Sequence, residues 1–548
     1  MKKEILFSML IVLVFACKTR QYTVIPPWRP YDESAELAAN ANHPAKKMQY
    51  KLIQSKLMDK NEIWKMVSDQ LCNFTEKKYQ KLKPFILEQD ILTLQSHIKS
   101  GILTYETLTQ WYLFRIVKYE NDRDKALNVI ISINPDAVSE ARKRDQNRST
   151  DDHPIFGMPI LLKDNIGFEG LSTTAGAAAL TKNRSTDAFI TTALKEKGGI
   201  ILGKTNLSEW ANYLCQDCPN GYSAVGGQTL NAYGRKQIDT GGSSSGSGAA
   251  MAANYAAAAV GTETSGSILS PSGKNSIVGL KPTVGLLSRS GIVPLSGTVD
   301  TPGPMTRNVT DNAILLSVLS GKDLSDPATK DHPGKFKFWE NLSAGTLKGL
   351  RFGVIKSFLK DSLYKVTTEK IASLGGIIIA FEPEQVKFDD FSTMLSADMK
   401  TDLPDYLAKY AAGVSFRTIS DIIAFNREDS LIRIPYGQVR FEEMQNRNIS
   451  QEELIKMRNN LHQDGVTYFE KPMVENQLDA ILSIDNRSAG FAAAAKYPCL
   501  AIPMGYRLNG EPCSLTFIAR PFEEDKLLKM GYAFEQGTRI RKMPIDYR

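Results

Sequence analysis

The sequence predicts an α/β fold in which helices cover both faces of a largely buried central sheet. From about residue 90 to the C-terminus, short apolar segments alternate with longer stretches of helical character. Strands that are buried on both faces have continuous apolar sequences of this kind. With 42% hydrophobic and 23% charged residues, the chain has the composition of an ordinary globular protein. The expected strands are 155–162, 199–202, 352–355, 377–381, 480–484 and 500–503.

The first 17 residues resemble a bacterial lipoprotein signal peptide. Lys2 and Lys3 precede an apolar run from Ile5 to Ala16, which is too short to cross a bilayer as a helix. Cys17 follows directly, and in lipoproteins this cysteine becomes the lipidated first residue of the mature chain. A plain signal peptide and an uncleaved anchor are the alternatives. We therefore expect a protein of the cell envelope, held on the periplasmic or outer surface by a lipid at Cys17.

The rest of the chain divides into a tether, an extension and one large domain. Two consecutive prolines and a third nearby indicate a tether over 18–43. Apolar residues at helical spacing predict a helical extension over 44–85. Residues 86–548 form the large domain, which begins with expected helices at 92–98 and 104–117. Within it, residues 385–475 are more polar and mainly helical, and we expect them to form a cap over the sheet.

Charge and cysteine content exclude several classes of function. The net charge of +7 is small for 548 residues and is not concentrated in a basic run, so we expect no nucleic-acid partner. Six cysteines are too few for a disulfide scaffold of this size. Cys215 and Cys218 are the one close pair, and they form either a disulfide or two free thiols. No cysteines or histidines have zinc spacing, so we predict no metal and no cofactor.

A run of small residues is the strongest candidate for a functional site. Residues 241–248 read Gly-Gly-Ser-Ser-Ser-Gly-Ser-Gly, an alanine-rich helix is expected over 249–259, and a second small-residue loop spans 261–268. A flexible linker would not continue directly into a strong helix former. A phosphate-binding loop would end in Gly-Lys-Ser or Gly-Lys-Thr, which this run does not. The pattern favours an array of hydroxyl groups that folds onto one pocket.

A lysine is the better candidate for the base that would activate a serine. None of the five histidines adjoins a serine-rich turn, and no Gly-x-Ser-x-Gly motif has the strand-turn-helix context of an α/β-hydrolase. We therefore expect His153 to be structural. Lys163 follows the apolar run 159–162, and burial there would lower its pKa. The alternatives are a solvated lysine or one paired with a neighbour such as Asp164.

Taken together, these motifs resemble those of the amidase signature family from about residue 90 to the C-terminus. The matching segments are 157–165, 202–210, 239–246, 261–268, 278–283, 300–304 and 497–503. The resemblance implies a mixed central sheet and a hydrolase that cleaves carboxylic amide bonds, with a small amide or a peptide amide as its substrate. It also implies that the enzyme works without a cofactor.

The resemblance further implies a Ser-cisSer-Lys triad. Lys163 matches the family's base, Ser243 the bridging serine with its cis peptide bond, and Ser267 the nucleophile. The separation of the two serines, 267 − 243 = 24, is the spacing of the family. The oxyanion hole is implied to consist of the backbone N–H groups of Thr264, Ser265, Gly266 and Ser267.

One departure from the family concerns the second loop. Many relatives carry Asp-Ile-Gly-Gly-Ser-Ile-Arg where this chain has Glu-Thr-Ser-Gly-Ser-Ile-Leu over 263–269. Leu269 in place of the arginine argues against substrates that depend on that side chain. A glutaminase-type amidotransferase subunit is the second enzymatic hypothesis, and secretion argues against it. A non-catalytic surface-binding lipoprotein with the same fold is the third hypothesis.

Overall fold

The computed structural model describes residues 23–149, 151–334 and 336–548. The predicted signal peptide, residues 1–17, lies outside this part of the chain. Within the described ranges, no helix has both the length and the apolar character needed to cross a membrane.

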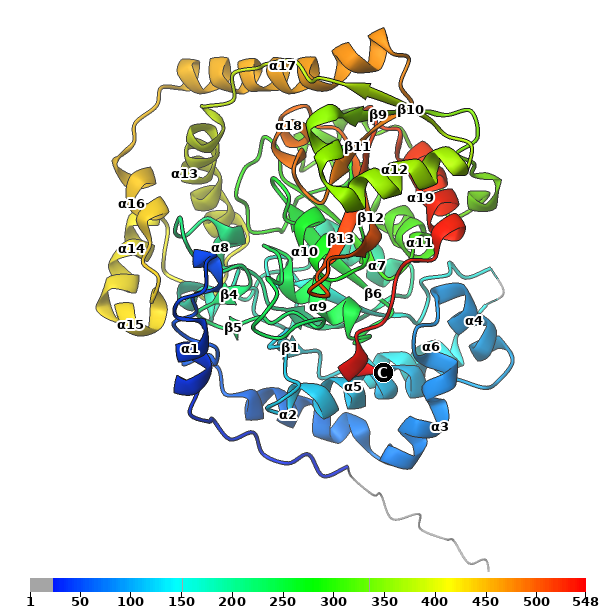
Figure 1. Ribbon diagram of the computed structural model, residues 1–548. Coiled ribbons are helices and arrows are strands. Elements are labelled where there is room, and N and C mark those ends of the chain that lie inside the picture. Colours follow the sequence, from blue (N-terminus) through cyan, green and yellow to red (C-terminus); the bar gives the residue numbers. More distant parts are fainter. Residues whose placement is uncertain (1–22, 150, 335) are drawn as a thin grey trace, which may run out of the picture.

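An 11-stranded mixed sheet forms the centre of the molecule, in the order β1-β3-β2-β6-β8-β7-β12-β13-β11-β9-β10 (Figure 1). Strand β2 is parallel to β3 and β6, and β9 is parallel to β10 and β11, while the remaining pairs are antiparallel. The predicted mixed α/β fold is confirmed. The strands are β1 (Ile130–Ile133), β2 (Pro159–Lys163), β3 (Ile200–Thr205), β6 (Ala258–Glu263), β7 (Val278–Lys281), β8 (Thr301–Thr306), β9 (Arg351–Ile355), β10 (Ile377–Phe381), β11 (Ala480–Ile484), β12 (Cys499–Tyr506) and β13 (Pro512–Ile518), with β4 (Tyr222–Ser223) and β5 (Gly227–Gln228) as a separate pair.

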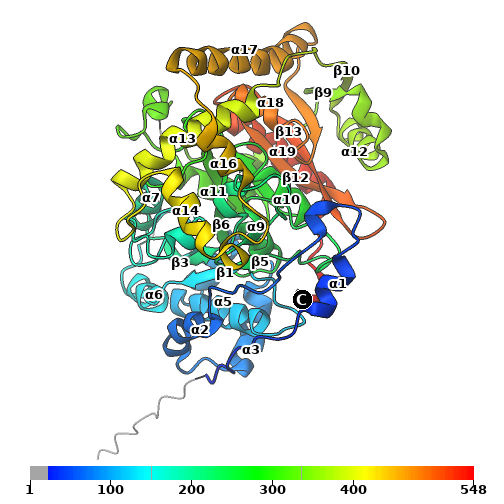
Figure 2. The ribbon, with the colours of Figure 1, turned by 90° about the vertical axis from the view of Figure 1, so that its left-hand side faces the viewer.

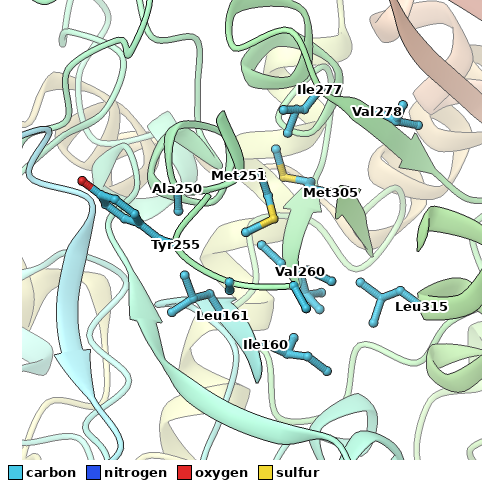
Figure 3. Close-up of a cluster of buried hydrophobic side chains, with 14 of the residues drawn as sticks. Ile160, Leu161, Ala250, Met251, Tyr255, Val260, Ile277, Val278, Met305 and Leu315 are labelled. Atoms are coloured by element: carbon cyan, nitrogen blue, oxygen red, sulfur yellow. The ribbon is translucent and has the colours of Figure 1, made fainter. Parts of the chain in front are cut away.

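Helices pack on the sheet and bury its apolar side chains. Helices α9 (Ser245–Ala252) and α10 (Leu269–Lys274) pack together on the sheet, and α11 (Val309–Leu319) packs on β8. Figure 3 shows Met251 of α9 and Leu315 of α11 near Val260 of β6, and all three are fully buried. Further helices of the body are α4 (Ile91–Lys99), α5 (Tyr105–Glu120), α6 (Ala137–Gln146), α7 (Phe189–Glu196), α8 (Glu209–Asn212), α12 (Ser362–Ser373), α18 (Ala489–Ala494) and α19 (Glu524–Thr538).

The predicted helical character of 385–475 is confirmed. The segment forms α13 (Phe391–Lys409), α14 (Ile419–Glu428), α15 (Ser430–Arg433), α16 (Val439–Asn446) and α17 (Gln451–Glu475). Helices α13, α14 and α16 lie beside one another at the edge of the molecule, and α17 runs across one end (Figures 1 and 2). Their apolar faces form a second hydrophobic cluster, in which Leu403 and Phe441 pack with Trp210 of the body. This cluster fastens the cap to the body.

The N-terminal part differs from the prediction in two ways. Residues 23–43 lie on the body instead of forming a free tether, since Asn121 Nδ2 donates to the Pro26 carbonyl (2.6 Å) and Asn40 Nδ2 donates to the Lys236 carbonyl (2.9 Å). They include a short helix, α1 (Ser34–Asn40). The predicted extension is helical only in its second half, in α2 (Lys60–Ser68) and α3 (Glu76–Ile86). Residues 49–59 are irregular, and their polar groups pair with the body, as in the bond from Gln228 N–H to the Ile53 carbonyl.

The alanine-rich helix expected over 249–259 is also shorter than predicted. Helix α9 ends at Ala252, Asn254 takes a left-handed φ of 59°, and the chain continues as β6 from Ala258. Parallel pairing with β2 explains the change, because Ala258 lies opposite Ile160 and Ala259 opposite Leu161. Long-range strand pairing here overrides the strong helix propensity of alanine.

Candidate active site

Three chain segments bring the predicted triad residues to one edge of the sheet. Lys163 is the last residue of β2, and because β2 and β6 are parallel, their carboxyl ends meet at the same edge. Ser267 lies in the turn between β6 and α10, and Ser243 lies just before α9. The Ser244 N–H donates to the Ser267 carbonyl at 3.0 Å, which joins the two serine loops directly.

The Lys163 amine lies among three oxygen atoms. Its Nζ is 2.7 Å from Ser243 Oγ, 2.9 Å from Thr262 Oγ1 and 3.2 Å from the Thr262 carbonyl. The Lys163 and Ser243 side chains are fully buried, and Ser267 is 7% exposed. A neutral amine has two N–H bonds and one lone pair. With its two N–H bonds on Thr262, the lone pair of Lys163 would face Ser243 Oγ.

Lys163 has no carboxylate partner in the part of the chain that the structure describes. The neighbouring Asp164 pairs with Lys204 instead, with 3.3 Å between Asp164 Oδ1 and Lys204 Nζ and both side chains fully buried. The alternative pairing of Lys163 with Asp164 is therefore wrong. Burial lowers the pKa of Lys163 to about 7, and the more distant carboxylates of Asp300 and Glu263 only partly oppose this effect. A large fraction of Lys163 is consequently neutral near pH 7.

The glycine- and serine-rich run is a close-packed turn and not a linker. Ser245 Oγ donates to the Gly241 carbonyl at 2.6 Å, and Ser247 Oγ donates to the Val260 carbonyl at 3.2 Å. A Cβ atom on Gly246 would lie 2.4 Å from the backbone oxygen of Asn206, so only glycine fits there. The peptide bond between Gly242 and Ser243 is cis, as the resemblance implied.

A buried carboxylate, Glu263, shapes the turn that carries Ser267. Its Oε1 accepts the Gly266 N–H at 2.8 Å, and its Oε2 accepts the N–H groups of Ile268 at 2.7 Å and Leu269 at 2.9 Å. These donors lie on both sides of Ser267 in the sequence. No role for Glu263 was predicted from the sequence, although an acidic residue next to a serine loop was a usable signal. We infer that Glu263 holds the turn.

Three of the four N–H groups that were predicted to form the oxyanion hole are free in this turn. Those of Thr264, Ser265 and Ser267 meet no acceptor within residues 23–149, 151–334 and 336–548. The Gly266 N–H differs from these three, because it donates to Glu263 Oε1 at 2.8 Å. Unpaired N–H groups that converge on one turn are suited to stabilising a developing oxyanion.

Three other residues that the sequence singled out, His153, Cys215 and Cys218, lie outside this cluster. His153 Nδ1 accepts the Ile155 N–H at 3.2 Å, and its ring packs edge-on against Trp339. Burial and nearby lysines lower the pKa of His153 to about 4, so it is neutral. Cys215 and Cys218 form a disulfide, which decides between the two alternatives that the sequence left open.

Comparisons with known proteins agree with this geometry. Residues 108–528 match the family model described as Amidase. The chain belongs to the amidase family. A probable amidase of Arabidopsis thaliana is 35% identical over 81% of this chain and 88% of its own. An amidase family protein from Bacillus anthracis has a TM-score of 0.86 at 36% identity, over 90% of this chain and 99% of its own.

Other relatives have narrower descriptions. The native peptide amidase of Stenotrophomonas maltophilia has a TM-score of 0.79 at 37% identity, over 84% of this chain and 98% of its own. One component of the glutamyl-tRNA(Gln) amidotransferase of Levilactobacillus brevis is 29% identical over 82% of this chain and 96% of its own. The protein is therefore an amidase, a hydrolase that acts on the carbon–nitrogen bond of carboxylic amides.

The inferred role of Glu263 in this amidase can be tested by substitution. Glu263→Gln keeps the volume but replaces one acceptor oxygen with an NH₂ group that would face a backbone N–H. The turn should loosen, and because small misplacements of a reacting group are costly, kcat should fall about 100-fold with little change in KM. Steady-state kinetics and circular dichroism would measure activity and folding.

Glu524→Gln is the matched control. Glu524 is also buried, and it accepts one backbone N–H, that of Thr283, at 2.7 Å. Glu263 and Glu524 both act electrostatically on Lys281. Its loss should leave kcat near the wild-type value. Equal losses of kcat in both variants would show that activity depends on the negative charge near Lys281 and not on the support that Glu263 gives the Ser267 turn.

Proposed function

We propose that Ser267 is the nucleophile of this amidase and that Ser243 and Lys163 form its proton relay. The observation that carries the proposal is the fully buried Lys163 amine, 2.7 Å from Ser243 Oγ and without a carboxylate partner in the described chain. A neutral amine can accept a proton, whereas an ion-paired lysine would hold one permanently.

In the first half of the reaction, Lys163 accepts the Ser243 hydroxyl proton while Ser243 accepts that of Ser267. Ser267 Oγ attacks the amide carbon, and the carbonyl oxygen becomes an oxyanion beside the free N–H groups of the turn. The carbon–nitrogen bond then breaks. The proton returns from Lys163 through Ser243 to the leaving nitrogen, which departs as ammonia or an amine and leaves an acyl ester on Ser267.

In the second half, water replaces the leaving group. The relay again removes a proton, now from the attacking water, and a second oxyanion forms at the same turn. The ester bond to Ser267 breaks, and the proton returns to Ser267 Oγ. The net reaction consumes one amide and one water and releases a carboxylic acid and ammonia or an amine.

A terminal peptide amide or a small carboxylic amide is the proposed substrate. The likeness to the peptide amidase of Stenotrophomonas maltophilia, at 37% identity over most of both chains, supports this class. The amidotransferase component is less similar, at 29% identity. The lipoprotein-like N-terminus also disfavours a role in a cytoplasmic amidotransferase.

Three substitutions test the relay. Ser267→Ala should abolish acyl-enzyme formation and labelling by a fluorophosphonate, with a fall in kcat/KM of about 10⁴-fold or more. Ser243→Ala and Lys163→Ala should each be severely damaging, and their effects should not add because a relay acts as a unit. His153→Ala is the control and should be mild. Near-normal hydrolysis by Ser267→Ala, measured on one cleaved amide, would disprove the assignment.

The pH dependence tests the base separately. Since only neutral Lys163 accepts a proton and its pKa is about 7, kcat/KM should rise as the pH increases through about 7 and then level off. Lys163→Arg has a side chain that stays protonated over this range, so it should remain inactive at every pH. A pH profile that is flat across neutrality would contradict the lowered pKa.

We also propose that the protein is lipid-anchored at Cys17 in the cell envelope. The order of Lys2-Lys3, the apolar run and Cys17 supports the anchor. The Cys215–Cys218 disulfide fits an oxidising compartment.

Expression in a bacterium tests the anchor. The product should be membrane-associated, and Cys17→Ser should release it or leave the precursor uncut. Intact-mass analysis that finds an unlipidated chain beginning well beyond Cys17 would overturn the anchor and leave the catalytic proposal untouched.

A further inference from the structure

A cavity of about 220 Å³ opens next to the proposed relay. Its inner wall includes Thr262, which contacts Lys163, and Thr264, which follows Glu263 in the Ser267 turn. Thr264 Oγ1 donates to Asp300 Oδ1 at 2.5 Å, and Asp300 also accepts the N–H groups of Leu295 and Ser296, which line the cavity. The cavity wall is therefore tied to the turn that would hold the reacting carbonyl group.

Helix α13 of the cap supplies the opposite wall. Asp402, Asp405, Tyr406 and Lys409 line the cavity, and their spacing of three and four residues places them on one face of the helix. The rings of Tyr406 and Tyr410 are 5.6 Å apart, and both residues line the same space. The cavity thus combines aromatic and apolar surface with charged groups from the cap.

Of the charged residues that line the cavity, Arg289 and Asp326 neutralise each other, whereas Asp300, Asp402 and Asp405 have no cationic partner in the described part of the chain. Asp326 forms two hydrogen bonds with the Arg289 guanidinium, at 2.9 and 2.6 Å. Asp402 uses only Oδ2, which accepts the Gly297 N–H at 2.6 Å, and Asp405 has no partner in the described part of the chain. Lys409 lies over the Tyr410 ring, 5.0 Å from its centre. An excess of negative charge therefore faces the cavity.

An independent feature of the wall indicates a missing hydrogen-bond donor. Asn165 lines the cavity, is only 3% exposed, and donates through Nδ2 to Thr262 Oγ1 and the Val293 carbonyl. Its Oδ1 is buried and has no partner among the described residues. Buried acceptors are normally paired, so this oxygen is an unsatisfied acceptor in the wall beside the cavity.

We propose that this cavity binds the acyl part of an amide substrate that carries an alkylammonium or guanidinium group, with Asp402 as its charge partner. The inference rests on the proposed function. When a terminal amide is cleaved, the leaving group is ammonia, so the substrate must be recognised through its acyl part. A cation between Asp402 and the tyrosine rings would gain a charge-assisted hydrogen bond and a cation–π contact.

The surroundings of Asp402 favour such a ligand. Burial and the nearby carboxylates of Asp398 and Asp300 raise the pKa of Asp402 to about 6, although the Gly297 N–H and Arg458 oppose the shift. Both oxygens of Asp398 and of Asp300 accept hydrogen bonds, so among these three carboxylates only Asp402 has an unused oxygen. A cationic substrate would relieve the repulsion that an ionised Asp402 experiences in this position.

A matched pair of substrates tests the proposal on the wild-type enzyme. N-acetyl-arginine amide and N-acetyl-citrulline amide have nearly the same shape, but only the first is charged. The wild type should have a kcat/KM at least about tenfold higher for the arginine amide. In Asp402→Asn, the ratio of the two kcat/KM values should fall towards one. Asp69→Asn, an exposed aspartate outside the cavity, should keep the wild-type ratio.

The outcomes separate this inference from the proposed function. If the wild type cleaves both amides equally, or prefers the citrulline amide, the cation site is wrong and the amidase mechanism stands. If Asp402→Asn keeps the full preference, Asp402 is not the charge partner. If neither amide nor a wider panel is cleaved and a fluorophosphonate does not label Ser267, the proposed function itself fails. The comparison of the two substrates needs no variant, so it tests the cation site even if Asp402→Asn does not fold.

Discussion

The buried, unpaired amine of Lys163 is the feature on which the rest of the site depends. Desolvation disfavours an ammonium group, and an adjacent carboxylate would reverse the effect. The chain places Asp164 directly after Lys163 but pairs it with Lys204 across the β2–β3 strand ends. Lys163 is thereby left with the oxygens of Thr262 and Ser243. One buried ion pair thus leaves the neighbouring lysine free for the base role proposed for it.

A second constraint concerns the backbone around Ser267. Free N–H groups can stabilise an oxyanion only if the turn holds them in fixed positions. A turn whose N–H groups had no internal acceptors would be mobile. Glu263 supplies those acceptors from the end of β6, and it uses three N–H groups while those of Thr264, Ser265 and Ser267 stay free. The longer reach of glutamate than aspartate suits a carboxylate that must serve donors on both sides of Ser267.

The fold class could be predicted from the alternation of apolar and helical segments, whereas the candidate site was reached through motifs. The resemblance to the amidase signature family singled out Lys163, Ser243 and Ser267, and the structure brings their segments to one sheet edge. Strand β8 was missed because Pro302, Gly303 and Pro304 are typical of a turn. It is nevertheless a strand, because Pro302 and Pro304 pair only with β6. The other neighbour, β7, pairs with Met305 and Thr306 and does not require an N–H group from either proline. The Asp164–Lys204 pair depends on a contact between neighbouring strands, which local patterns do not reveal.

The division between body and cap suggests how such an enzyme separates chemistry from recognition. The proposed relay, the Ser267 turn and Glu263 all belong to the sheet and the loops at its edge, which strand pairing and the hydrogen bonds of Glu263 hold in place. Asp402, Tyr406 and Lys409 belong to α13, which the cap's own hydrophobic cluster fastens to the body. Side chains on the cavity-facing surface of α13 can therefore change without disturbing the hydrogen bonds of Lys163 or Ser267. Substrate choice in this architecture can vary on one helix while the reaction stays the same.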